Sequence, residues 1–331
     1  MEFAIMSKHV FITGGGGLIG LTLARDLVSH GYKITLFDLA EQFSRRQREV
    51  DELVASGAVS IAIGTIMDRW AVTLAAQGCD SAVHLAAMLG VKRTEDNRLL
   101  CMDINVNGTD NVLNACVQNR IEHVILASSS EVYGEPTYNP VHEGVETKGK
   151  TVYAVSKLAT EELVKGYHQI HPDLNYTIVR FFNTYGEGQV AQFVVSKFVK
   201  RVLDGKNPQV YGDGSQTRSY CHVNDTVEGL RAILERPVAL NRVFNIGNSV
   251  EKFTLKEVAQ KVIDLVAPDK GLSVEIVPFE ESDRTPEREI ITRYCDNSLA
   301  VKELGLNPKV SLDEGIRRIA ASVIHEDWAD R

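Results

Sequence analysis

The sequence predicts an α/β fold: a doubly wound parallel sheet followed by a smaller α/β lobe at the C-terminal end. Three observations lead to this prediction. Short runs rich in β-branched residues alternate with longer helical patterns, a glycine-rich turn follows the first run, and the regular alternation stops after Phe182. Strands separated by helices of this length connect as right-handed crossovers, which place parallel strands in one sheet with helices on both faces.

The period of the apolar residues predicts the individual elements. Strands are predicted at His9–Thr13, Lys33–Phe37, Val59–Ile63, Ser81–Ala86, His123–Ala127 and Asn175–Phe181. Between them, helices are predicted near Leu18–His30, Glu41–Ser56, Asp68–Gln77, Asn97–Asn119 and Tyr153–Ile170. Later helices are predicted near Ala191–Asp204, Val223–Leu234, Leu255–Val266 and Leu312–His325. We therefore expect a first domain over residues 1–182 and a second lobe over residues 183–331.

The composition is that of an ordinary globular protein. Of the 331 residues, 44% are hydrophobic and 24% are charged, and the formal net charge is -8. An acidic chain does not favour general binding to nucleic acid or to anionic membranes. The five cysteines are scattered without a C-x-x-C pair, which is typical of reduced thiols and not of a disulfide framework or a zinc site. With no recognisable secretory signal, we expect a cytoplasmic protein without a bound metal.

A glycine-rich turn joins the first predicted strand to the first predicted helix. Gly14, Gly17 and Gly20 form the spacing G-x-x-G-x-x-G, and Leu18 and Ile19 begin the helix. Glycines allow a tight turn, and a helix N-terminus presents amide donors and a positive dipole end to a diphosphate. The position between strand and helix predicts a Rossmann-type dinucleotide-binding domain, with these five residues at the cofactor.

Asp38 follows the second predicted strand, about 20 residues after the glycines. A carboxylate at this position accepts hydrogen bonds from the ribose hydroxyls of the adenosine half and repels a 2′-phosphate, so NAD is favoured over NADP. Arg45, Arg46 and Arg48 follow it and could serve a phosphate, but a run of charges is typical of a solvated helix face.

Tyr153 and Lys157 begin a helical pattern and lie four residues apart, on one face of the helix. A free phenol titrates near pH ~10 and is a poor base at neutral pH. A neighbouring ammonium and a cationic nicotinamide both favour the phenolate. The pair therefore predicts a tyrosine base assisted by a lysine, in a site at the carboxyl end of the sheet. Ser129 and Ser130 follow the strand His123–Ala127, where ligands bind in parallel sheets, and a hydroxyl there can stabilise an oxyanion.

These features occur in the order typical of one family. The motifs are Thr13-to-Gly20, Asp38, His84-Leu85-Ala86-Ala87, Asn105 before Gly108-Thr109, Ser128-to-Gly134, Tyr153-to-Lys157, Arg180-to-Gly186 and Val210-to-Arg218. As a set they resemble the extended short-chain dehydrogenase/reductase family, in its nucleotide-sugar epimerase/dehydratase branch. The resemblance covers nearly the whole chain.

The resemblance implies a tightly held NAD that is reduced and reoxidised within one turnover. It assigns Tyr153 as the base that takes the proton of the sugar C4 hydroxyl, and Lys157 as the residue that holds the nicotinamide ribose and lowers the pKa of the tyrosine. Ser129 matches the catalytic Ser/Thr of the family. Further cofactor contacts are expected from Leu85, Ala86 and Ala87, and from Asp68 at adenine. The family usually has Gly-Asp after the third strand, whereas this chain has Gly64-Thr65 there.

The resemblance also implies a nucleotide-sugar site and an arrangement of the chain. The substrate contacts it assigns are Ser129, Ser130, Asn183, Val210, Gly212, Arg218 and Arg284, with Glu289 beside the last. A UDP-sugar is expected. Residues 223–246 are expected to return to the NAD domain, and the helices Asn97–Asn119 and Tyr153–Ile170 to form a homodimer interface. His84 and His222 are interpreted as structural.

Three reactions begin with oxidation at C4. A 4-epimerase returns the hydride to the other face, a 4,6-dehydratase needs an acid/base residue beside C5 and C6, and a decarboxylase accepts a uronic acid. Glu131 lies where dehydratases and UDP-glucuronate decarboxylases carry a glutamate, but Ser130 replaces the acid of the usual dehydratases. We predict a 4-epimerase by a narrow margin, with Glu131 as a fourth catalytic candidate. A simple NAD-dependent dehydrogenase and a non-catalytic NAD-binding sensor are alternatives of another class.

Overall fold

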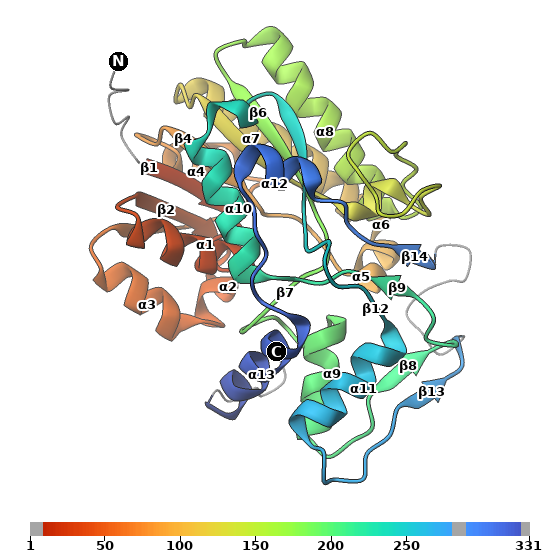
Figure 1. Cartoon of the computed structure of the whole chain (residues 1–331). Helices are drawn as coiled ribbons and strands as arrows, with labels where there is room; N and C mark the ends of the chain where they lie inside the picture. The colour runs from red at the N-terminus through yellow and green to blue at the C-terminus, as the bar shows by residue number, and fades with distance from the viewer. Residues whose placement is uncertain (1–8, 280–288, 326–331) are drawn as a thin grey trace.

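A computed structural model describes residues 9–279 and 289–325 of the chain (Figure 1). Its centre is a seven-stranded sheet with the strand order β11-β6-β5-β4-β1-β2-β3, and every pair of neighbouring strands is parallel. The order reverses between β1 and β4, as in other doubly wound sheets. The predicted α/β class with a doubly wound parallel sheet is therefore confirmed.

The first part of the chain alternates strands and helices. Its elements are β1 (His9–Thr13), α1 (Leu18–Ser29), β2 (Lys33–Asp38), α2 (Ala40–Ser44), α3 (Gln47–Ala55), β3 (Val59–Ile63), α4 (Arg69–Ala75), β4 (Ser81–His84), α5 (Val91–Asp96), α6 (Arg98–Met102), the π-helical η1 (Asp103–Asn107), α7 (Gly108–Gln118), β5 (His123–Ser129), the 3-10 turn η2 (Ser130–Tyr133), α8 (Val152–Ile170) and β6 (Asn175–Phe181).

The second part is less regular. Its elements are β7 (Thr184–Tyr185), α9 (Val194–Leu203), β8 (Gln209–Tyr211), β9 (Thr217–Arg218), β10 (Cys221–His222), α10 (Val223–Glu235), the 3-10 turn η3 (Pro237–Ala239), β11 (Arg242–Ile246), β12 (Phe253–Thr254), α11 (Leu255–Val266), β13 (Glu275–Val277), β14 (Thr292–Arg293), α12 (Ser298–Leu304) and α13 (Leu312–His325).

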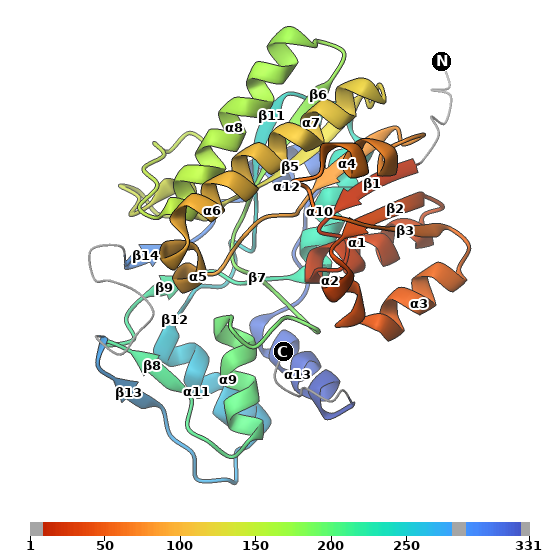
Figure 2. The ribbon, with the colours of Figure 1, turned by 180° about the vertical axis from the view of Figure 1, so that it is seen from behind.

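Helices cover both faces of the sheet. On one face, α1, α3, α10 and α12 bury a core that includes Leu21, Val50, Leu230 and Leu304 (Figure 1). On the other face, α4, α7 and α8 bury a second core, seen from behind in Figure 2. Burial on both faces explains the nearly continuous apolar runs of the strands.

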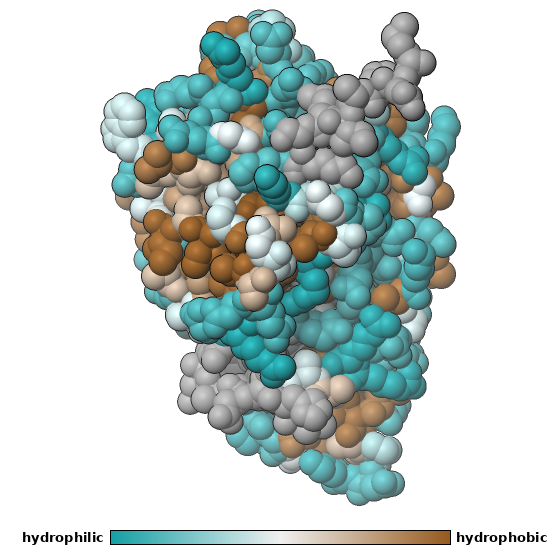
Figure 3. All heavy atoms as spheres, turned by 90° about the vertical axis from the view of Figure 1, so that its left-hand side faces the viewer, coloured by the Kyte–Doolittle hydropathy of each residue, from teal (hydrophilic) through white to brown (hydrophobic). Residues whose placement is uncertain are grey.

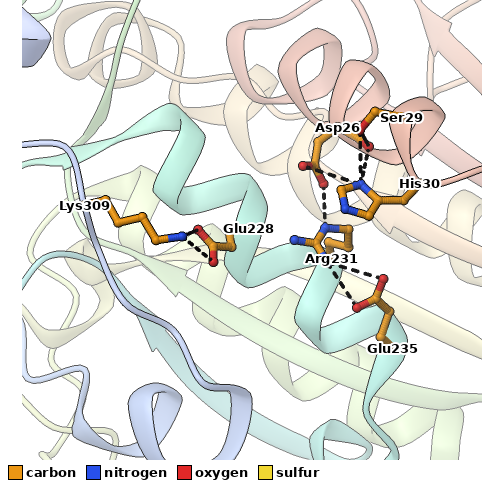
Figure 4. Close-up of polar contacts among 7 residues, drawn as sticks. All are labelled: Asp26, Ser29, His30, Glu228, Arg231, Glu235 and Lys309. Atoms are coloured by element: carbon orange, nitrogen blue, oxygen red, sulfur yellow. Dashed lines mark hydrogen bonds and ion pairs between the residues drawn. The ribbon is translucent and has the colours of Figure 1, made fainter.

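Residues 223–246 contribute α10 and β11 to this sheet layer. β11 pairs with β6 in parallel, and α10 packs along α1. Figure 4 shows the polar contacts at this packing: Arg231 of α10 donates to Asp26 of α1 at 2.9 Å and is paired with Glu235 of its own helix. Glu228, also on α10, is paired with Lys309.

Most of the rest of the second part, apart from α12, forms a smaller lobe below the carboxyl end of the sheet. Helices α9, α11 and α13 and strand β8 share one apolar core, which includes Val199, Val210, Val262 and Ile316. Short strands connect the lobe internally: β13 pairs with β8, and β9 lies between β12 and β14. The lobe therefore carries its own apolar core beneath the sheet (Figure 1).

Two predicted helices are interrupted. The predicted helix Glu41–Ser56 is two helices, α2 and α3, because Arg46 has a non-helical backbone with φ -130° and ψ 37°. The predicted helix Asn97–Asn119 contains the π-helical turn η1, in which the Asn105 side chain bonds to both backbone groups of Met88. Both interruptions depend on contacts with distant segments, which a periodic pattern does not report.

The sheet ends at β3, whose outer edge has no neighbouring strand among the described residues. Apolar side chains gather on this side of the molecule in Figure 3, and β3 and α4 expose Ile61, Ile63, Trp70 and Leu74. None of the helices in the described ranges has the length and apolar character needed to cross a bilayer. Within residues 9–279 and 289–325, no group of three His, Cys, Asp or Glu side chains could hold a metal ion.

Candidate active site

The glycine-rich turn between β1 and α1 packs so closely that side chains are excluded from it. Gly14 has a φ of +73°, and a Cβ atom there would lie 2.8 Å from the backbone nitrogen of Ala86. A Cβ atom at Gly20 would collide with the carbonyl oxygen of Gly14. α1 begins after Gly17, at Leu18, without a side-chain cap on its first turn. Uncapped amides at the positive end of a helix dipole suit a phosphate ligand.

Asp38 lies at the end of β2 and is hydrogen-bonded to this turn. Its Oδ2 accepts a hydrogen bond from the backbone of Gly16 at 3.0 Å, and its Oδ1 accepts one from Leu39 at 2.8 Å. Burial raises the pKa of this carboxyl, and the two backbone hydrogen bonds oppose the rise. An ionised Asp38 places negative charge beside the turn, which disfavours an additional phosphate on the ribose.

The segment after β4 forms the opposite wall of the turn. The backbone nitrogens of Leu85 and Ala86 donate to the carbonyl oxygen and to Oγ1 of Thr13, at 3.1 and 3.3 Å. His84 bonds Thr13 Oγ1 through Nδ1 at 2.6 Å and Thr109 Oγ1 through Nε2 at 2.9 Å. Burial lowers the pKa of His84 to about 3. A neutral histidine with both ring nitrogens bonded is a structural residue that holds β1, β4 and α7 together.

Asp68 lies at the N-terminus of α4, outside this wall. Its Oδ1 accepts hydrogen bonds from the backbone nitrogens of Trp70 and Ala71, both at 3.0 Å, so it caps the helix. Ala87 is half-buried and directly follows Ala86. The contact of Asp68 with the adenine stays a prediction, as does the contact of Ala87 with the cofactor.

Ser129, Tyr153 and Lys157 come together at the carboxyl end of β5. β5 ends at Ser129, and α8 carries Tyr153 and Lys157 one turn apart. The Tyr153 hydroxyl is hydrogen-bonded to Ser129. The Lys157 Nζ lies 5.8 Å from the centre of the Tyr153 ring and donates to the carbonyl oxygen of Ala127 at 2.7 Å. The arrangement holds a phenol, an alcohol and an ammonium in one group.

The titration of this group is controlled mainly by burial. Burial, followed by the charge of Glu131, raises the pKa of Tyr153, and the Ser129 hydrogen bond opposes this. Burial lowers the pKa of Lys157 to about 8. The Lys157 Nζ donates to the carbonyl oxygen of Ala127, and the lowering of the tyrosine pKa by Lys157 stays a prediction. The positive charge of a bound nicotinamide would also favour the phenolate.

Glu131 lies in the turn after β5 and links the catalytic helix to the lobe. Its Oε1 lies 3.6 Å from Nη2 of Arg293, whose side chain is only 3% exposed. Its Oε2 accepts a hydrogen bond from Thr151 at 3.4 Å. Thr151 in turn caps α8 by accepting the backbone N–H of Ala154 at 3.1 Å. A carboxylate near Tyr153 is therefore paired with a buried guanidinium.

Arg218 lies next to Arg293 across the β9–β14 pair. The two residues are opposite each other in a parallel register, and both are buried. The Arg218 guanidinium donates to backbone carbonyls of Thr217 and of the segment Ile290–Ile291, and it lies 3.6 Å from the Glu289 carboxylate. The described contacts of Arg218 thus hold β14 in place, and its contact with a diphosphate stays a prediction.

The other predicted substrate residues differ in their surroundings. Asn183 has a φ of +40° and donates from Nδ2 to the carbonyl oxygen of Ser219 at 2.7 Å. Val210 is buried in the lobe core. A Cβ atom on Gly212 would lie 3.3 Å from the ring of Phe279, which makes Phe279 a neighbour of the expected base pocket. Ser130 is buried in the turn before Glu131. Arg284 lies outside the described residues.

Known proteins resemble this chain in sequence and in fold. The sequence pattern of the NAD dependent epimerase/dehydratase family matches residues 10–247. The chain belongs to this family. It is 34% identical over 322 residues to a UDP-N-acetyl-alpha-D-glucosaminuronate decarboxylase from Bacillus cytotoxicus, covering 94% of this chain and 96% of that protein. It is 28% identical to a putative UDP-glucose 4-epimerase from Methanocaldococcus jannaschii, covering 94% and 96% of the two chains.

A solved member of the family has the same fold. The structure of DesIV, a dTDP-glucose 4,6-dehydratase from Streptomyces venezuelae with NAD bound, superposes with a TM-score of 0.86 at 25% identity, covering 96% of this chain and 97% of that one. The chain is therefore an NAD-dependent enzyme of the nucleotide-sugar epimerases and dehydratases. The three relatives are named for three reactions, so the exact reaction is a separate question.

The residues present in this epimerase/dehydratase fit NAD. The glycines between Gly14 and Gly20 keep the backbone of the turn free of side chains, and Asp38 accepts a hydrogen bond from Gly16 at its edge. When bound, NAD accepts and returns a hydride. Leu18, Ile19 and Gly20 open the helix at the cradle, and Lys157 and Tyr153 lie at the carboxyl end of the same sheet.

Sequence reasoning did not identify Arg293 and Thr151 as residues of this site. Arg293 is separated from Glu131 by more than 150 positions, and its segment Thr292-Arg293-Tyr294 has no recognisable motif. Thr151 before a helical pattern is an N-cap signal, but its bond to Glu131 depends on the tertiary structure. A charged residue in an otherwise apolar, strand-like segment was the available signal for Arg293.

Proposed function

We propose that this enzyme acts on a UDP-linked uronic acid, which it oxidises at C4 and then decarboxylates. The observation that carries the proposal is the ion pair of Glu131 with the buried Arg293, beside Tyr153. A buried cation is costly unless it has an anionic partner. A neutral sugar has no group at C6 that requires such a charge, whereas a uronic acid carries its carboxylate there.

Oxidation at C4 is the first step. Tyr153 takes the proton of the C4 hydroxyl, and Ser129, which is hydrogen-bonded to the phenol, holds the same oxygen. Lys157 in its ammonium form supports the phenolate from one helical turn away. A base and a hydrogen-bond donor on the same oxygen are the groups that the oxidation of an alcohol needs.

The C4 ketone makes loss of the C6 carboxylate possible. The oxidised sugar is a β-keto acid, so the electrons of the C5–C6 bond move into the ketone as carbon dioxide leaves. The resulting enolate oxygen lies where Tyr153 and Ser129 donate hydrogen bonds. Arg293 orients the carboxylate before it leaves, and Glu131 holds Arg293 in place. Protonation at C5 and return of the hydride to C4 yield a UDP-pentose without net oxidation.

The 4-epimerase predicted from the sequence is the second candidate. Ser129, Tyr153 and Lys157 are sufficient for it, and the contacts of Glu131 with Arg293 and Thr151 are also compatible with a purely structural carboxylate. In that case the 4-keto sugar rotates and receives the hydride on its other face. The relatives named for decarboxylation at 34%, 31% and 30% identity favour the first candidate.

Product mass decides between these reactions. The enzyme is incubated with UDP-glucuronate, UDP-N-acetylglucosaminuronate, UDP-glucose and UDP-N-acetylglucosamine, and the products are analysed by chromatography and mass spectrometry. Loss of carbon dioxide from a uronate is the expected result. An unchanged mass at a new chromatographic position would establish epimerisation, and loss of water would establish a dehydratase. Net accumulation of NADH would indicate a simple dehydrogenase, and no conversion with NAD still bound would indicate a sensor.

We also propose that the enzyme is a homodimer, which works in the reducing cytoplasm. Helices α7 and α8 lie side by side on the face shown in Figure 2, and Leu163, Tyr167 and Ile170 line a hollow between them. All five cysteines are buried free thiols, as suits a reducing compartment. By light scattering, Ile170→Lys should give monomers and Trp70→Lys, on the β3 and α4 face, should leave the dimer intact. A monomeric wild-type protein would contradict the dimer.

A further inference from the structure

Arg46 differs from the two arginines beside it. It lies at the break between α2 and α3, where its backbone leaves the helical conformation. Arg45 is exposed, and the side chain of Arg48 is 89% exposed, as expected for a solvated face. The Arg46 side chain is only 13% exposed. At the break, one of the three neighbouring arginines is therefore turned inward.

The Arg46 guanidinium is held firmly but is not fully bonded. Nε and Nη2 donate to the two carboxylate oxygens of Glu49, at 2.5 and 2.7 Å. The remaining nitrogen, Nη1, is buried and has no hydrogen-bond partner within the described part of the chain. A buried donor without a partner is costly. Nη1 thus keeps a donor that no group in the described part of the chain satisfies.

The local charges favour an anion as the acceptor for Nη1. Glu49 also accepts a hydrogen bond from Arg25 at 2.9 Å, so two guanidinium groups share one carboxylate. Burial opposes ionisation of Glu49, but Arg46 and Arg25 together hold its pKa below its usual range. The group of three therefore carries one positive charge in excess.

The position of Arg46 connects it to the cofactor cradle. Gln42, one turn before Arg46, packs on the glycine turn: a Cβ atom on Gly16 would lie 2.9 Å from the Gln42 backbone. On the other side, a Cβ atom on Gly188 would lie 2.5 Å from Nη2 of Arg46. Gly188 belongs to the turn after β7, and its neighbour Glu187 bonds His222 at the start of α10. Arg46 thus lies between the glycine turn and the first turn of the lobe.

We propose that Arg46 binds the diphosphate of the NAD held at the glycine turn, through Nη1. A guanidinium fixed by a carboxylate is preorganised for a phosphate oxygen, and such charge-assisted bonds are stronger than neutral ones. Its contact with Gly188 also joins the cofactor to the lobe. This inference rests on the NAD dependence of the family and not on which sugar reaction follows.

The test compares Arg46→Gln with Arg48→Gln in the full chain freed of nucleotide. Calorimetric titrations with NAD, ADP-ribose, adenosine and NADP are the measurements. Arg46→Gln should weaken NAD and ADP-ribose by roughly 10- to 100-fold, the range for a hydrogen bond to a charged group. Adenosine, which lacks both phosphates, should change by less than about threefold, and Arg48→Gln should match the wild type for all four.

Four results would overturn the proposal. An unchanged NAD affinity in Arg46→Gln would show that Nη1 has no role in binding. An equal loss for adenosine would indicate a collapsed pocket, and a loss confined to NADP would assign Arg46 to a 2′-phosphate. Thermal unfolding of each variant shows whether it is folded. Arg46→Lys keeps the positive charge without the planar group and should lose less NAD affinity than Arg46→Gln. Equal losses in both variants would indicate packing alone.

Discussion

The glycine turn after β1 and the cluster around Glu131 after β5 lie at the same end of the sheet but are assembled differently. The turn is made by residues close together in the sequence, and its properties belong to the backbone: positive φ at Gly14, an uncapped helix end and no room for Cβ atoms. The Glu131 cluster is made by side chains from η2, the N-cap of α8 and β14. The cofactor side, which is the glycine turn, thus depends on local sequence, whereas the proposed sugar side, which is the Glu131 cluster, depends on the tertiary structure.

The largest expected effect is a loss of turnover in a variant whose cofactor side is intact. Tyr153→Phe deletes the base and the donor to the C4 oxygen, so turnover should fall by roughly 1,000-fold or more. NAD content should be unchanged, because the hydroxyl contributes little to cofactor affinity. Rate measurements with NAD quantified in the same preparation test both statements, and a near-normal rate would reject the assigned base.

The reverse experiment breaks the cofactor side alone. Gly14→Ala forces a Cβ atom against the backbone of Ala86 and strains a residue at φ +73°. We expect a loss of about 1–3 kcal/mol in unfolding free energy and a fall in NAD affinity on the order of 100-fold. Denaturant titration and NAD binding measure these. Gly166→Ala is the matched control, because its Cβ position is open; equal effects in both variants would contradict the argument.

Glu131→Gln separates the two proposed reactions. Removing the charge frees Arg293 from its described ion pair, so a decarboxylase should slow by about 10- to 100-fold, in the range of a group that positions a reactant. A 4-epimerase should keep nearly its full rate. Steady-state rates with the accepted substrate decide, and NAD content serves as the control for the intact cofactor side.

The pH dependence should reveal opposite effects on activity and stability. Activity should fall by about tenfold per pH unit above about 8, because the Lys157 ammonium, with its pKa lowered to about 8, loses its proton. The folded pKa lies below the ordinary value of 10.5, so the unfolded chain binds more protons between the two values, and this group favours folding as pH rises. Rate and denaturant profiles from pH 7 to about 10 test this. Lys157→Met should remove both dependences.

The smallest effect is expected away from both regions. Arg231→Gln removes the bond between α10 and Asp26 of α1, which is partly exposed. Such pairs contribute about 0.5–1 kcal/mol or less. Thermal unfolding should show this small loss, with rate and NAD affinity unchanged. A large loss of activity would mean that the α1–α10 packing positions the glycine turn.

Local patterns were sufficient for the sheet and for the glycine turn. The strands predicted at His9–Thr13, Val59–Ile63 and Asn175–Phe181 have these bounds in the structure, and the helix from Leu255 to Val266 does as well. Each depends on a run of residues whose period or composition reports burial directly. The break at Arg46 and the π-helical turn at Asn105 were not predicted, because distant contacts with Gly188 and Met88 determine them.

The sequence by itself determined the doubly wound α/β fold and the glycine turn after β1, since both follow from local patterns, and it placed Tyr153 and Lys157 four residues apart on one helix. Only the tertiary structure placed Arg293 against Glu131, and Arg46 between Gly188 and the glycine turn. The physical reason is that a backbone cradle forms wherever its few residues fold, whereas a buried charge finds its partner only when separate elements pack. In the proposed function, the choice of sugar reaction depends on the second kind of contact.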